Sequence, residues 1–410
     1  KRFTPEYETD YSTWVATDDL DRTTPLNPDA GDTKEKYVGL FYFIFHSDDT
    51  TGKVINDVTE MYLNGGAQNV TDTLSSFAGR NGAYWAEPYF GYYTSNDVWV
   101  YRKHASMLSA AGVDFIFLDL SNNKFYTEQV TLLFDTWLQM RKEGMDTPQI
   151  CMMFGDMPYT TLNGLYTLLD PIYNNEEYKE LLFCYEGKPL LLGNTDTPKS
   201  REWTNSTGTT PQSKAEYLNL LEQNPEVKEF YENEYQSVLE RFTVRKCWAW
   251  QAGTHDGYWD WLQESPQALG TDSEGNPEQI SVSLGVHAHT SRGRSYVNSM
   301  NNYNKEGEYG FRLTSTPYGK FFEEQFEYAL TQDVDVLMIT GWNEWYAGVQ
   351  STSNQNQTTG QTLTPGFYMV DQCSPEYSRD GEPMKLRDGV GFGDNYYYQM
   401  VSYIRKFKGI

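Results

Sequence analysis

The sequence predicts an α/β protein, a (β/α)8 TIM-type barrel with long loops on the C-terminal face, where its strands end. Apolar runs of strand length alternate with amphipathic stretches of helical length, and parallel strands joined by helical crossovers produce that alternation. The runs are apolar throughout, which is typical of strands buried on both faces. The Gly-rich phosphate loop of an open, doubly wound nucleotide-binding sheet is absent from the sequence, so the barrel is favoured over that alternative.

Seven strands can be assigned, and we expect an eighth, short strand near residues 385–394. The seven lie at residues 38–46, 113–120, 149–155, 189–193, 242–250, 279–286 and 334–340. Helices are expected at residues 97–111, 127–142, 213–221, 317–331 and 395–407. Gly112 is suited to end the first of these helices, and Asp394 is suited to cap the last one.

The chain divides at about residue 36. Residues 1–36 are rich in Thr, Asp and Pro and show little periodicity, so we expect an extended N-terminal arm, followed by one catalytic barrel domain over residues 37–410. Long polar loops interrupt the barrel, and nearly all follow the carboxyl end of a strand, the face that bears the active site in such barrels. These loops cover residues 47–96, 195–212, 251–277, 287–316 and 346–393.

The composition narrows the class of ligand. Asp and Glu number 57 against 32 Lys and Arg, which gives a formal charge of −25, and such a surface repels nucleic acids and anionic membranes. No run reaches the roughly 18 apolar residues of a membrane span. Aromatic residues make up 16% of the chain, with 32 Tyr. Tyr and Trp offer a flat apolar face with a polar edge, which matches a sugar, although a Tyr-rich core explains the count equally well.

Neither a cofactor nor a metal ion is expected. No pair among the four cysteines has metal-ligand spacing, and no disulfide framework is indicated. Cys151 and Cys247 lie in apolar runs and are expected as buried thiols. A Gly-x-Ser-x-Gly segment, which would present a nucleophilic serine, is also absent.

Glu344 is the first candidate catalytic residue. It follows the apolar run at 334–340 and lies between Trp342 and Trp345, and carboxylates at the strand ends of barrels are typically catalytic. Apolar surroundings raise the pKa of a carboxyl group, so that it can donate a proton near neutral pH. The two Trp rings could also stack on a sugar. The structural alternative is a glutamate that bonds to the loop backbone.

A catalytic carboxyl group beside a sugar suggests glycoside hydrolysis, and that reaction needs a second carboxylate. Asp119, at the end of the strand predicted over residues 113–120, is the preferred partner, and its structural alternative is to cap the following turn. Glu87 is the runner-up, because it lies among the six aromatic rings of residues 83–93. Tyr93 closes that segment and is a candidate substrate contact, unless the segment is an aromatic loop packed over the barrel.

Other strand ends supply further candidates for substrate contact. They are His46, Asp156, Trp248 and Trp250, together with Asp256 in the segment that follows Trp250. Residues in such places more often support the site than perform chemistry, and a lone strand-end histidine is commonly structural. The acidic and aromatic residues of the tail, near Arg379, either reach the site or anchor the last helix.

Three segments resemble the barrel superfamily of glycoside hydrolase families 71 and 99 and of the family 99-like domains linked to polysaccharide biosynthesis. They are Val-Gly-Leu-Phe-Tyr-Phe at 38–43, Gly-Tyr-Tyr at 91–93 with the stretch that follows to Asp119, and Thr-Gly-Trp-Asn-Glu-Trp at 340–345. Within that superfamily the chain resembles uncharacterised bacterial glycan-degradation proteins. The resemblance implies a barrel that acts on glycans with a pair of strand-end carboxylates. The family's Gly-Glu-Gly is here Tyr-Ala-Gly at 346–348, so the second carboxylate must come from another strand.

We therefore expect a monomeric O-glycosyl hydrolase, acting on a poly- or oligosaccharide in a secreted, periplasmic or cell-surface location. Glu344 would be the general acid, and Asp119, or failing that Glu87, the nucleophile or base. Two alternatives remain. One is a non-catalytic barrel that only binds glycan, and the other is a family 99-like glycosyltransferase, which would need a nucleotide- or lipid-linked donor.

Overall fold

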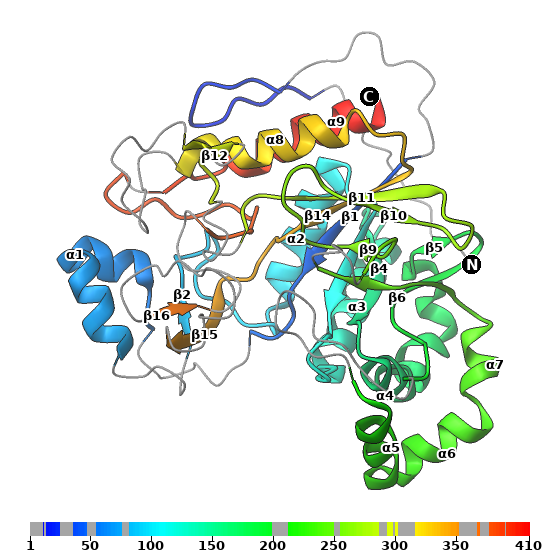
Figure 1. Ribbon diagram of the computed structural model, residues 1–410. Coiled ribbons are helices and arrows are strands. Elements are labelled where there is room, and N and C mark those ends of the chain that lie inside the picture. The colour runs from blue at the N-terminus through cyan, green and yellow to red at the C-terminus, as the bar shows by residue number, and fades with distance from the viewer. Residues whose placement is uncertain are drawn as a thin grey trace.

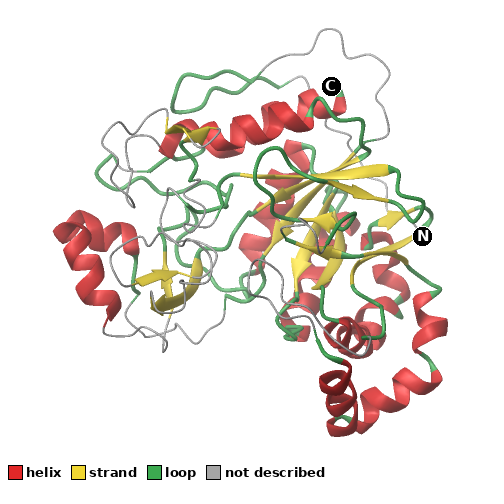
Figure 2. Cartoon of the chain, viewed as in Figure 1, coloured by secondary structure: helices red, strands yellow, loops and turns green. Residues whose placement is uncertain are grey.

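A curled sheet of parallel strands forms the centre of the molecule, as a computed structural model of the chain shows (Figure 1). The structure describes residues 11, 14–24, 36–46, 55–75, 82–198, 212–249, 255–286, 293–297, 300–301, 316–351, 367–369, 377–389 and 391–410. Helices lie outside the central strands, and a small sheet stands with the helix α1 (Val58–Ser75) to one side of them (Figures 1 and 2). The predicted α/β barrel class is confirmed.

Seven strands of the main sheet run parallel, in the order β11, β14, β1, β3, β4, β6 and β7. In chain order they are β1 (Tyr37–Tyr42), β3 (Phe115–Asp119), β4 (Gln149–Gly155), β6 (Lys188–Gly193), β7 (Thr243–Arg245), β11 (Pro277–Ser283) and β14 (Val336–Thr340). Each falls within or overlaps one of the seven predicted runs. Two short antiparallel strands flank them, β5 (Cys184–Tyr185) on β6 and β10 (Leu269–Thr271) on β11.

A short strand that the sequence did not reveal lies beside β11, outside the main sheet. The run predicted at 242–250 breaks into β7 and β8 (Cys247–Trp248), and β8 pairs in parallel with β9 (Trp259–Asp260). The side-chain amide of Gln279 on β11 then donates to the Asp260 carbonyl at 2.9 Å and accepts from its N–H at 3.2 Å. The prediction of a strand near 385–394 is wrong, because the described residues there form turns and bridges.

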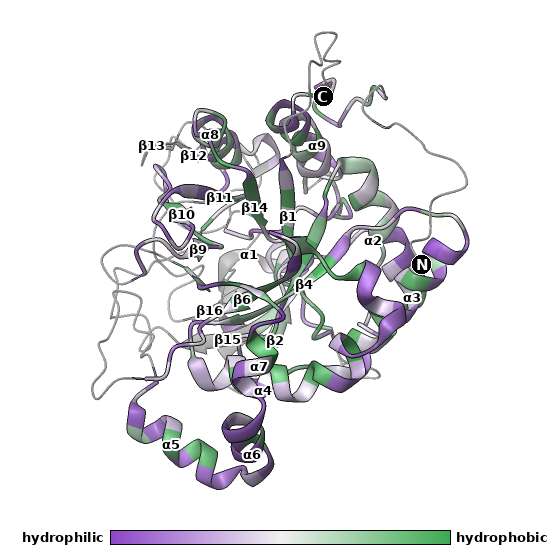
Figure 3. Cartoon of the chain, turned by 90° about the vertical axis from the view of Figure 1, so that its right-hand side faces the viewer, coloured by the Kyte–Doolittle hydropathy of each residue, from purple (hydrophilic) through white to green (hydrophobic). Residues whose placement is uncertain are grey.

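Side chains along the strands alternate between two apolar clusters. Phe41, Phe117 and Met338 belong to an inner cluster built mainly from strand residues. The residues next to them in the chain, such as Leu40 and Leu337, pack in an outer cluster with the helices. This period-2 alternation explains why the runs lack polar residues, since both faces of each strand are buried. The strand β14 is accordingly green in the hydropathy view (Figure 3).

The helices lie outside the sheet, most of them near it and α1 to one side (Figure 1). They are α1 (Val58–Ser75), α2 (Val98–Ala111), α3 (Thr127–Lys142), α4 (Pro158–Leu168), α5 (Lys214–Gln223), α6 (Pro225–Asn233), α7 (Tyr235–Leu239), α8 (Lys320–Ala329) and α9 (Asn395–Lys408), with shorter turns at Leu169–Tyr173, Glu176–Leu181 and Thr316–Tyr318. The remaining strands form small sheets: β2 (Gly82–Tyr84), β15 (Tyr346–Ser351) and β16 (Phe367–Met369) in one, β12 (Tyr296–Val297) and β13 (Met300–Asn301) in another.

The five predicted helices are present as α2, α3, α5, α8 and α9. The Asp97 side chain caps α2, and Gly112 ends it in the left-handed conformation, φ 85°, as expected from glycine's freedom at helix ends. Asp394 occupies the cap position of α9, but its side chain makes no capping hydrogen bond, so that part of the prediction is wrong. The sequence missed α1, α4, α6 and α7.

Residues 14–24 lie against the last helix. Arg22 donates to the Asn395 carbonyl at 3.2 Å, and Arg405 donates to the Tyr11 carbonyl at 2.7 Å. The arm expected over residues 1–36 stays a prediction, since most of it lies outside the described residues. Cys151 and Cys247 are buried free thiols, as predicted. No helix in the described parts of the chain has the length and apolar character to cross a membrane.

Candidate active site

Glu344 lies at the carboxyl end of β14, on a turn that needs glycine. Gly341 ends the strand at φ +94°, and a Cβ atom there would lie 1.9 Å from the carbonyl oxygen of Arg379. The backbone of Arg379 can therefore pass directly over the turn. Glu344 is only 4% exposed, and its Oε2 accepts a hydrogen bond of 2.8 Å from Nη2 of Arg379.

The tail segment, residues 377–382, is fixed on both sides of Arg379. Arg294 donates to the carbonyl of Ser378 at 2.8 Å and to the carbonyl of Asp380 at 2.7 Å. Its guanidinium also lies over aromatic rings, with the nearest ring centroid 4.1 Å away. The Asp380 carboxylate accepts from the backbone N–H of Glu344 at 2.7 Å. Arg294 therefore fixes the backbone on either side of Arg379, and Asp380 fixes the backbone of Glu344. Both partners of the ion pair are held in place by buried polar contacts.

The ion pair changes what Glu344 can do chemically. A guanidinium in hydrogen-bond contact stabilises the negative charge of a carboxylate. A general acid must instead be protonated before the reaction begins. The hydrogen bond from Arg379 thus stabilises the ionised form of the Glu344 carboxylate. The neighbouring Asp380 differs, because burial raises the pKa of its carboxyl group above the ordinary value.

The Glu382 carboxylate is the centre of a second buried hydrogen-bond network. Its carboxylate accepts from the Tyr93 hydroxyl at 2.6 Å and from Nε1 of Trp345 at 2.5 Å, and it lies 3.0 Å from Nε2 of His104. The other ring nitrogen of His104 is hydrogen-bonded to the Tyr42 hydroxyl at 2.8 Å. Burial raises the pKa of both tyrosines well above the ordinary value, so they remain neutral donors. This network ties β1, α2 and the tail segment to the Glu344 turn.

Trp342 and Trp345, predicted as sugar platforms, are fully buried. The Trp345 ring stacks on Trp85 with 4.4 Å between centroids, and Trp342 lies edge to face with His104 at 5.5 Å. Both rings are therefore part of the packed interior, and the ring that lies beside the ion pair is that of Trp261, 5.0 Å from the Arg379 guanidinium.

Asp119 and Asp156 end two neighbouring strands, β3 and β4. Asp119 continues the inward-facing register of Phe117, is partly exposed, and accepts from the Ser121 hydroxyl at 2.7 Å. Asp156 is buried, and its Oδ2 lies 3.1 Å from Nε2 of His255. Burial raises the pKa of the Cys247 thiol well above its ordinary value, and the charges of both aspartates add to this effect. Both carboxylates therefore lie near the inner face of the barrel.

Glu87 forms ion pairs away from this group, with Lys385 at 2.9 Å and Arg387 at 2.5 Å. Burial alone would raise the pKa of Glu87, but the hydrogen bonds from these two cations hold it below the ordinary value. The interaction joins the loop after β2 to the tail, which is a structural role. The structure does not bring Glu87 into contact with Glu344, Asp119 or their described partners.

His46 lies just beyond β1, and it is buried beside the Tyr93 ring, with 5.5 Å between centroids. Burial lowers its pKa to about 3, so the imidazole is neutral. The backbone of Asn343 lies close to the imidazole and partly offsets the effect of burial on its pKa, but neither ring nitrogen makes a hydrogen bond of good geometry with a described residue. A buried imidazole with both nitrogens unsatisfied is costly, and a sugar hydroxyl could satisfy either nitrogen.

The remaining predicted contacts follow β7 in the chain and differ in exposure. Trp248 is half-buried and packs against Gly155, whose added Cβ would lie 2.9 Å from its ring. Asp256 is exposed. Trp250 lies outside the described residues. Within those residues no group of three or more His, Cys, Asp or Glu side chains could hold a metal ion.

Sequence reasoning missed several residues that build the site. Arg294 lies in a polar loop without periodicity, and His104 lies inside a helix, so neither carried a signal. Asn343 did carry one, as part of the Trp-Asn-Glu-Trp segment. Its side chain accepts from the Phe43 N–H at 2.8 Å and donates to the Phe43 carbonyl at 2.9 Å, which locks β1 to the Glu344 turn.

No family model matches the sequence, and no curated protein matches it either. Among solved structures the chain is similar to the family 99 endo-alpha-mannosidase from Bacteroides thetaiotaomicron. One structure, in complex with bis-tris-propane, has 12% identity and a TM-score of 0.47. A second has 14% identity and a TM-score of 0.45, and both comparisons cover 92% of this chain and 98% of that one.

The chain is also similar to a structure described as a glycoside hydrolase-like protein. That comparison gives 12% identity and a TM-score of 0.44, and it covers 93% of this chain and 96% of that one. The resemblance to family 99 that the sequence suggested is thus found again as a structural similarity.

Proposed function

We propose that this chain is a glycoside hydrolase that cleaves O-glycosidic bonds at the carboxyl-terminal mouth of its barrel. The observation that carries the proposal is the strand-end carboxylate of Glu344, buried and held by Arg379 at 2.8 Å. Strand ends are where barrel enzymes place catalytic carboxylates. A buried ion pair costs desolvation energy, and a catalytic role gives a reason for maintaining one there.

The two carboxylates take opposite roles in this proposal. Glu344 acts ionised, as the nucleophile or as the base that activates water, because Arg379 stabilises its charge. Asp119 donates the proton to the leaving oxygen, supported by its inward register on β3 and its partial exposure. Inversion of the anomeric centre would need a carboxylate separation of roughly 6.5–9.5 Å and retention about 5–5.5 Å.

The net charge of the protein and the neutral imidazole of His46 indicate the class of substrate. The formal charge of −25 disfavours polyanionic substrates, so the proposal is a neutral poly- or oligosaccharide. The neutral imidazole of His46 would exchange hydrogen bonds with a sugar hydroxyl on the side of β1 next to Glu344. A polymer of this kind is met outside the cytoplasm, and we propose a secreted, periplasmic or cell-surface location.

The test is a screen of soluble neutral polysaccharides with the wild-type chain and with Glu344→Gln, Asp119→Asn and the exposed control Glu176→Gln. We expect the first two variants to lose at least a thousandfold in turnover while the control retains full activity. Product anomers read by NMR during the first minutes give the stereochemistry. Full activity of Glu344→Gln would overturn the proposal.

Azide rescue separates the two roles if the enzyme retains configuration. Azide replaces a missing nucleophile and gives a glycosyl azide of inverted configuration, whereas rescue of a missing acid/base residue gives the retained configuration. We expect inverted azide from Glu344→Ala and retained azide from Asp119→Ala. The reverse pattern would return the acid role to Glu344.

A barrel that only binds glycan is the second candidate. The observation that favours it is the residue at 347, where the family motif has its second glutamate and this chain has alanine. It predicts that the wild-type chain binds an oligosaccharide of the panel without releasing product, and that Asp119→Asn leaves the affinity unchanged.

A further inference from the structure

Two neighbouring indole rings, those of Trp248 and Trp261, connect the Glu344 side of the barrel mouth with the Asp119 side. The backbone N–H of Trp261 donates to the Trp248 carbonyl at 3.0 Å, which holds the two residues side by side where β8 and β9 end. Their ring centroids are 6.2 Å apart, with 87° between the ring planes. The two indoles therefore form a corner, in which one ring stands at right angles to the other.

Trp261 makes the contacts on the Glu344 side. Its ring lies 5.0 Å from the Arg379 guanidinium, which donates to the Glu344 carboxylate at 2.8 Å. The same ring lies 5.0 Å from the Phe41 ring and belongs to the inner apolar cluster. Since Trp261 is packed in this way and is only 7% exposed, it provides a fixed wall for the Trp248 ring.

Trp248 makes the contacts on the Asp119 side. Its ring packs on Gly155 at the end of β4, where an added Cβ atom would lie 2.9 Å from the ring and 3.1 Å from the Ser121 Cβ. The Ser121 hydroxyl in turn donates to the Asp119 carboxylate at 2.7 Å. Trp248 is half-buried, so part of its surface remains accessible next to Asp119.

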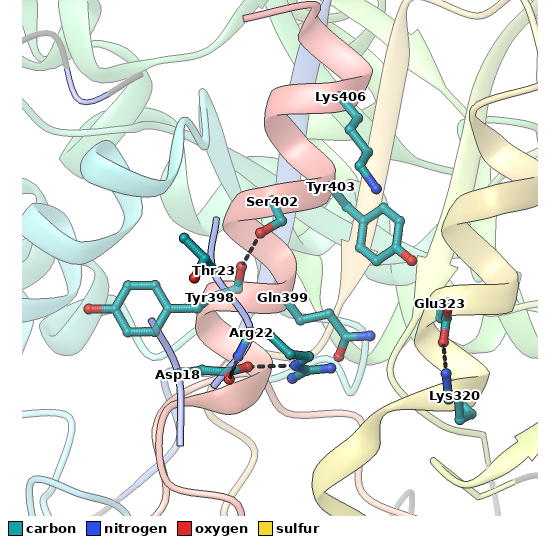
Figure 4. A pocket seen from close by; sticks show the side chains of 10 residues that line it. All are labelled: Asp18, Arg22, Thr23, Lys320, Glu323, Tyr398, Gln399, Ser402, Tyr403 and Lys406. Carbon is teal, nitrogen blue, oxygen red and sulfur yellow. Dashed lines mark hydrogen bonds and ion pairs between the residues drawn. The ribbon is translucent and has the colours of Figure 1, made fainter. Parts of the chain in front are cut away.

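The pocket of about 330 Å³ between α8, α9 and residues 14–24 differs from this aromatic corner (Figure 4). Its lining comes from the two helices and the N-terminal segment, without a contribution from a strand end. The Tyr403 ring in that lining is stacked on Phe326 at 4.7 Å and has the Lys406 amine 4.7 Å from its centroid. Because that ring is covered, the indole pair at the barrel mouth is the better aromatic surface for a ligand.

The groups around the indole pair indicate the chemistry of the ligand. An indole offers a flat apolar face, which matches the C–H face of a pyranose ring. The carboxylates of Asp119 and Asp156 follow the ends of β3 and β4, on the side where Trp248 packs on Gly155. An anionic sugar would bring like charge to this place, whereas the hydroxyls of a neutral sugar can donate to both carboxylates.

We propose that Trp248 is the platform for the neutral pyranose unit at the cleaved bond, and that Trp261 holds this platform in position. The proposal rests on the proposed function, because a glycoside hydrolase places its two carboxylates, here Glu344 and Asp119, on either side of that bond. Stacking on Trp248 fixes the plane of the sugar ring, and with it the position of the anomeric carbon between the carboxylates. Trp248 thus contributes to turnover through orientation as well as to binding.

The test compares Trp248→Leu, which removes the aromatic face, with Trp248→Phe, which keeps one. Trp99→Leu is the matched control, because Trp99 is also an accessible tryptophan, 53% exposed, but lies on α2. Each change is made in the wild-type chain for turnover and in Glu344→Gln for binding. The probes are mannotetraose, maltotetraose, cellotetraose and xylotetraose, with affinity measured by calorimetry and folding checked by urea unfolding.

We expect Trp248→Leu to weaken binding of the preferred probe roughly tenfold and to lower kcat by at least as much, while Trp248→Phe recovers most of both losses. Trp99→Leu should match its parent. In Glu344→Gln labelled with ¹⁵N at the indole nitrogens, the Trp248 resonance is identified by its absence from Trp248→Phe, and it should shift when the probe is added.

Parental affinity and turnover in Trp248→Leu would overturn the platform, and hydrolysis by the wild-type chain would leave the proposed function intact. If Trp248→Leu does not fold, an unshifted Trp248 resonance in the presence of a bound probe overturns the platform instead. Binding that depends on Trp248, with no hydrolysis by the wild-type chain, would overturn the proposed function and keep the platform. Binding of none of the probes would overturn the platform as well.

Discussion

The Glu344–Arg379 pair allows a quantitative test of how the site is built. The two side chains are only 6% and 2% exposed, so solvent screens their interaction weakly. Arg379→Met keeps the length of the side chain and removes its charge, which leaves a buried carboxylate without its guanidinium. Breaking a buried pair in this way costs about 3–5 kcal/mol. At about 1.4 kcal/mol per tenfold, the folding equilibrium should fall by roughly two to four orders of magnitude.

Urea unfolding at pH 7 measures this loss, followed by Trp fluorescence. The double variant Arg379→Met with Glu344→Gln removes both charges, so it should regain at least half of the stability that the single variant loses. The coupling free energy from the double-mutant cycle isolates the pair from the other contacts of each residue. If Arg379→Met costs less than about 1 kcal/mol, or if the double variant is no more stable than it, the buried ion pair is not what holds Glu344.

Three further predictions concern the same region. Gly341→Ala should destabilise the fold by more than about 2 kcal/mol and reduce turnover, because its Cβ would meet the Arg379 carbonyl at 1.9 Å. The control Gly389→Ala, also at positive φ but in open space, should cost less by urea unfolding. The folded pKa of His46 is lowered to about 3, so the unfolded chain binds the proton first as pH falls below 6.5. The free energy of unfolding therefore decreases as pH falls from 6.5 toward 3. By pH 5 that loss is roughly 2 kcal/mol, and His46→Gln should flatten the acid limb of the stability curve. The lowered pKa of Glu87 adds stability above pH 4.5 that is lost as pH falls below this value, so thermal melts of Glu87→Gln should show a smaller decline there.

The sequence predicted those parts of the fold in which local pattern and burial agree. The central strands are apolar because both faces are buried, and α3 was located at its observed bounds, Thr127–Lys142. The helix α4 was missed because most of its residues are buried on every side, so it lacks an amphipathic stripe. The strand β9 was missed because it has only two residues. Its hydrogen bonds to β11 are made by the Gln279 side chain and not by a backbone ladder.

The candidate site was predicted in part. A strand-end position and flanking aromatic rings identified Glu344 from local sequence alone. Its partner Arg379 is 35 residues away and Arg294 is further still, and a polar loop carries no periodicity that would bring them together. The expected role of the two Trp rings depended on exposure, which local sequence does not determine. Both are covered by side chains from distant segments, Trp85 and His104 among them.

The tail segment has a consequence for the order in which a working protein emerges during synthesis. When β14 has been translated, all parallel strands of the barrel exist, yet the guanidinium that holds Glu344 and the Asp380 carboxylate that holds its backbone are still to come. A nascent chain that ends before residue 380 would therefore have a nearly complete barrel without an organised site. The partners that organise the Glu344 turn would thus be added late, within the last tenth of the chain.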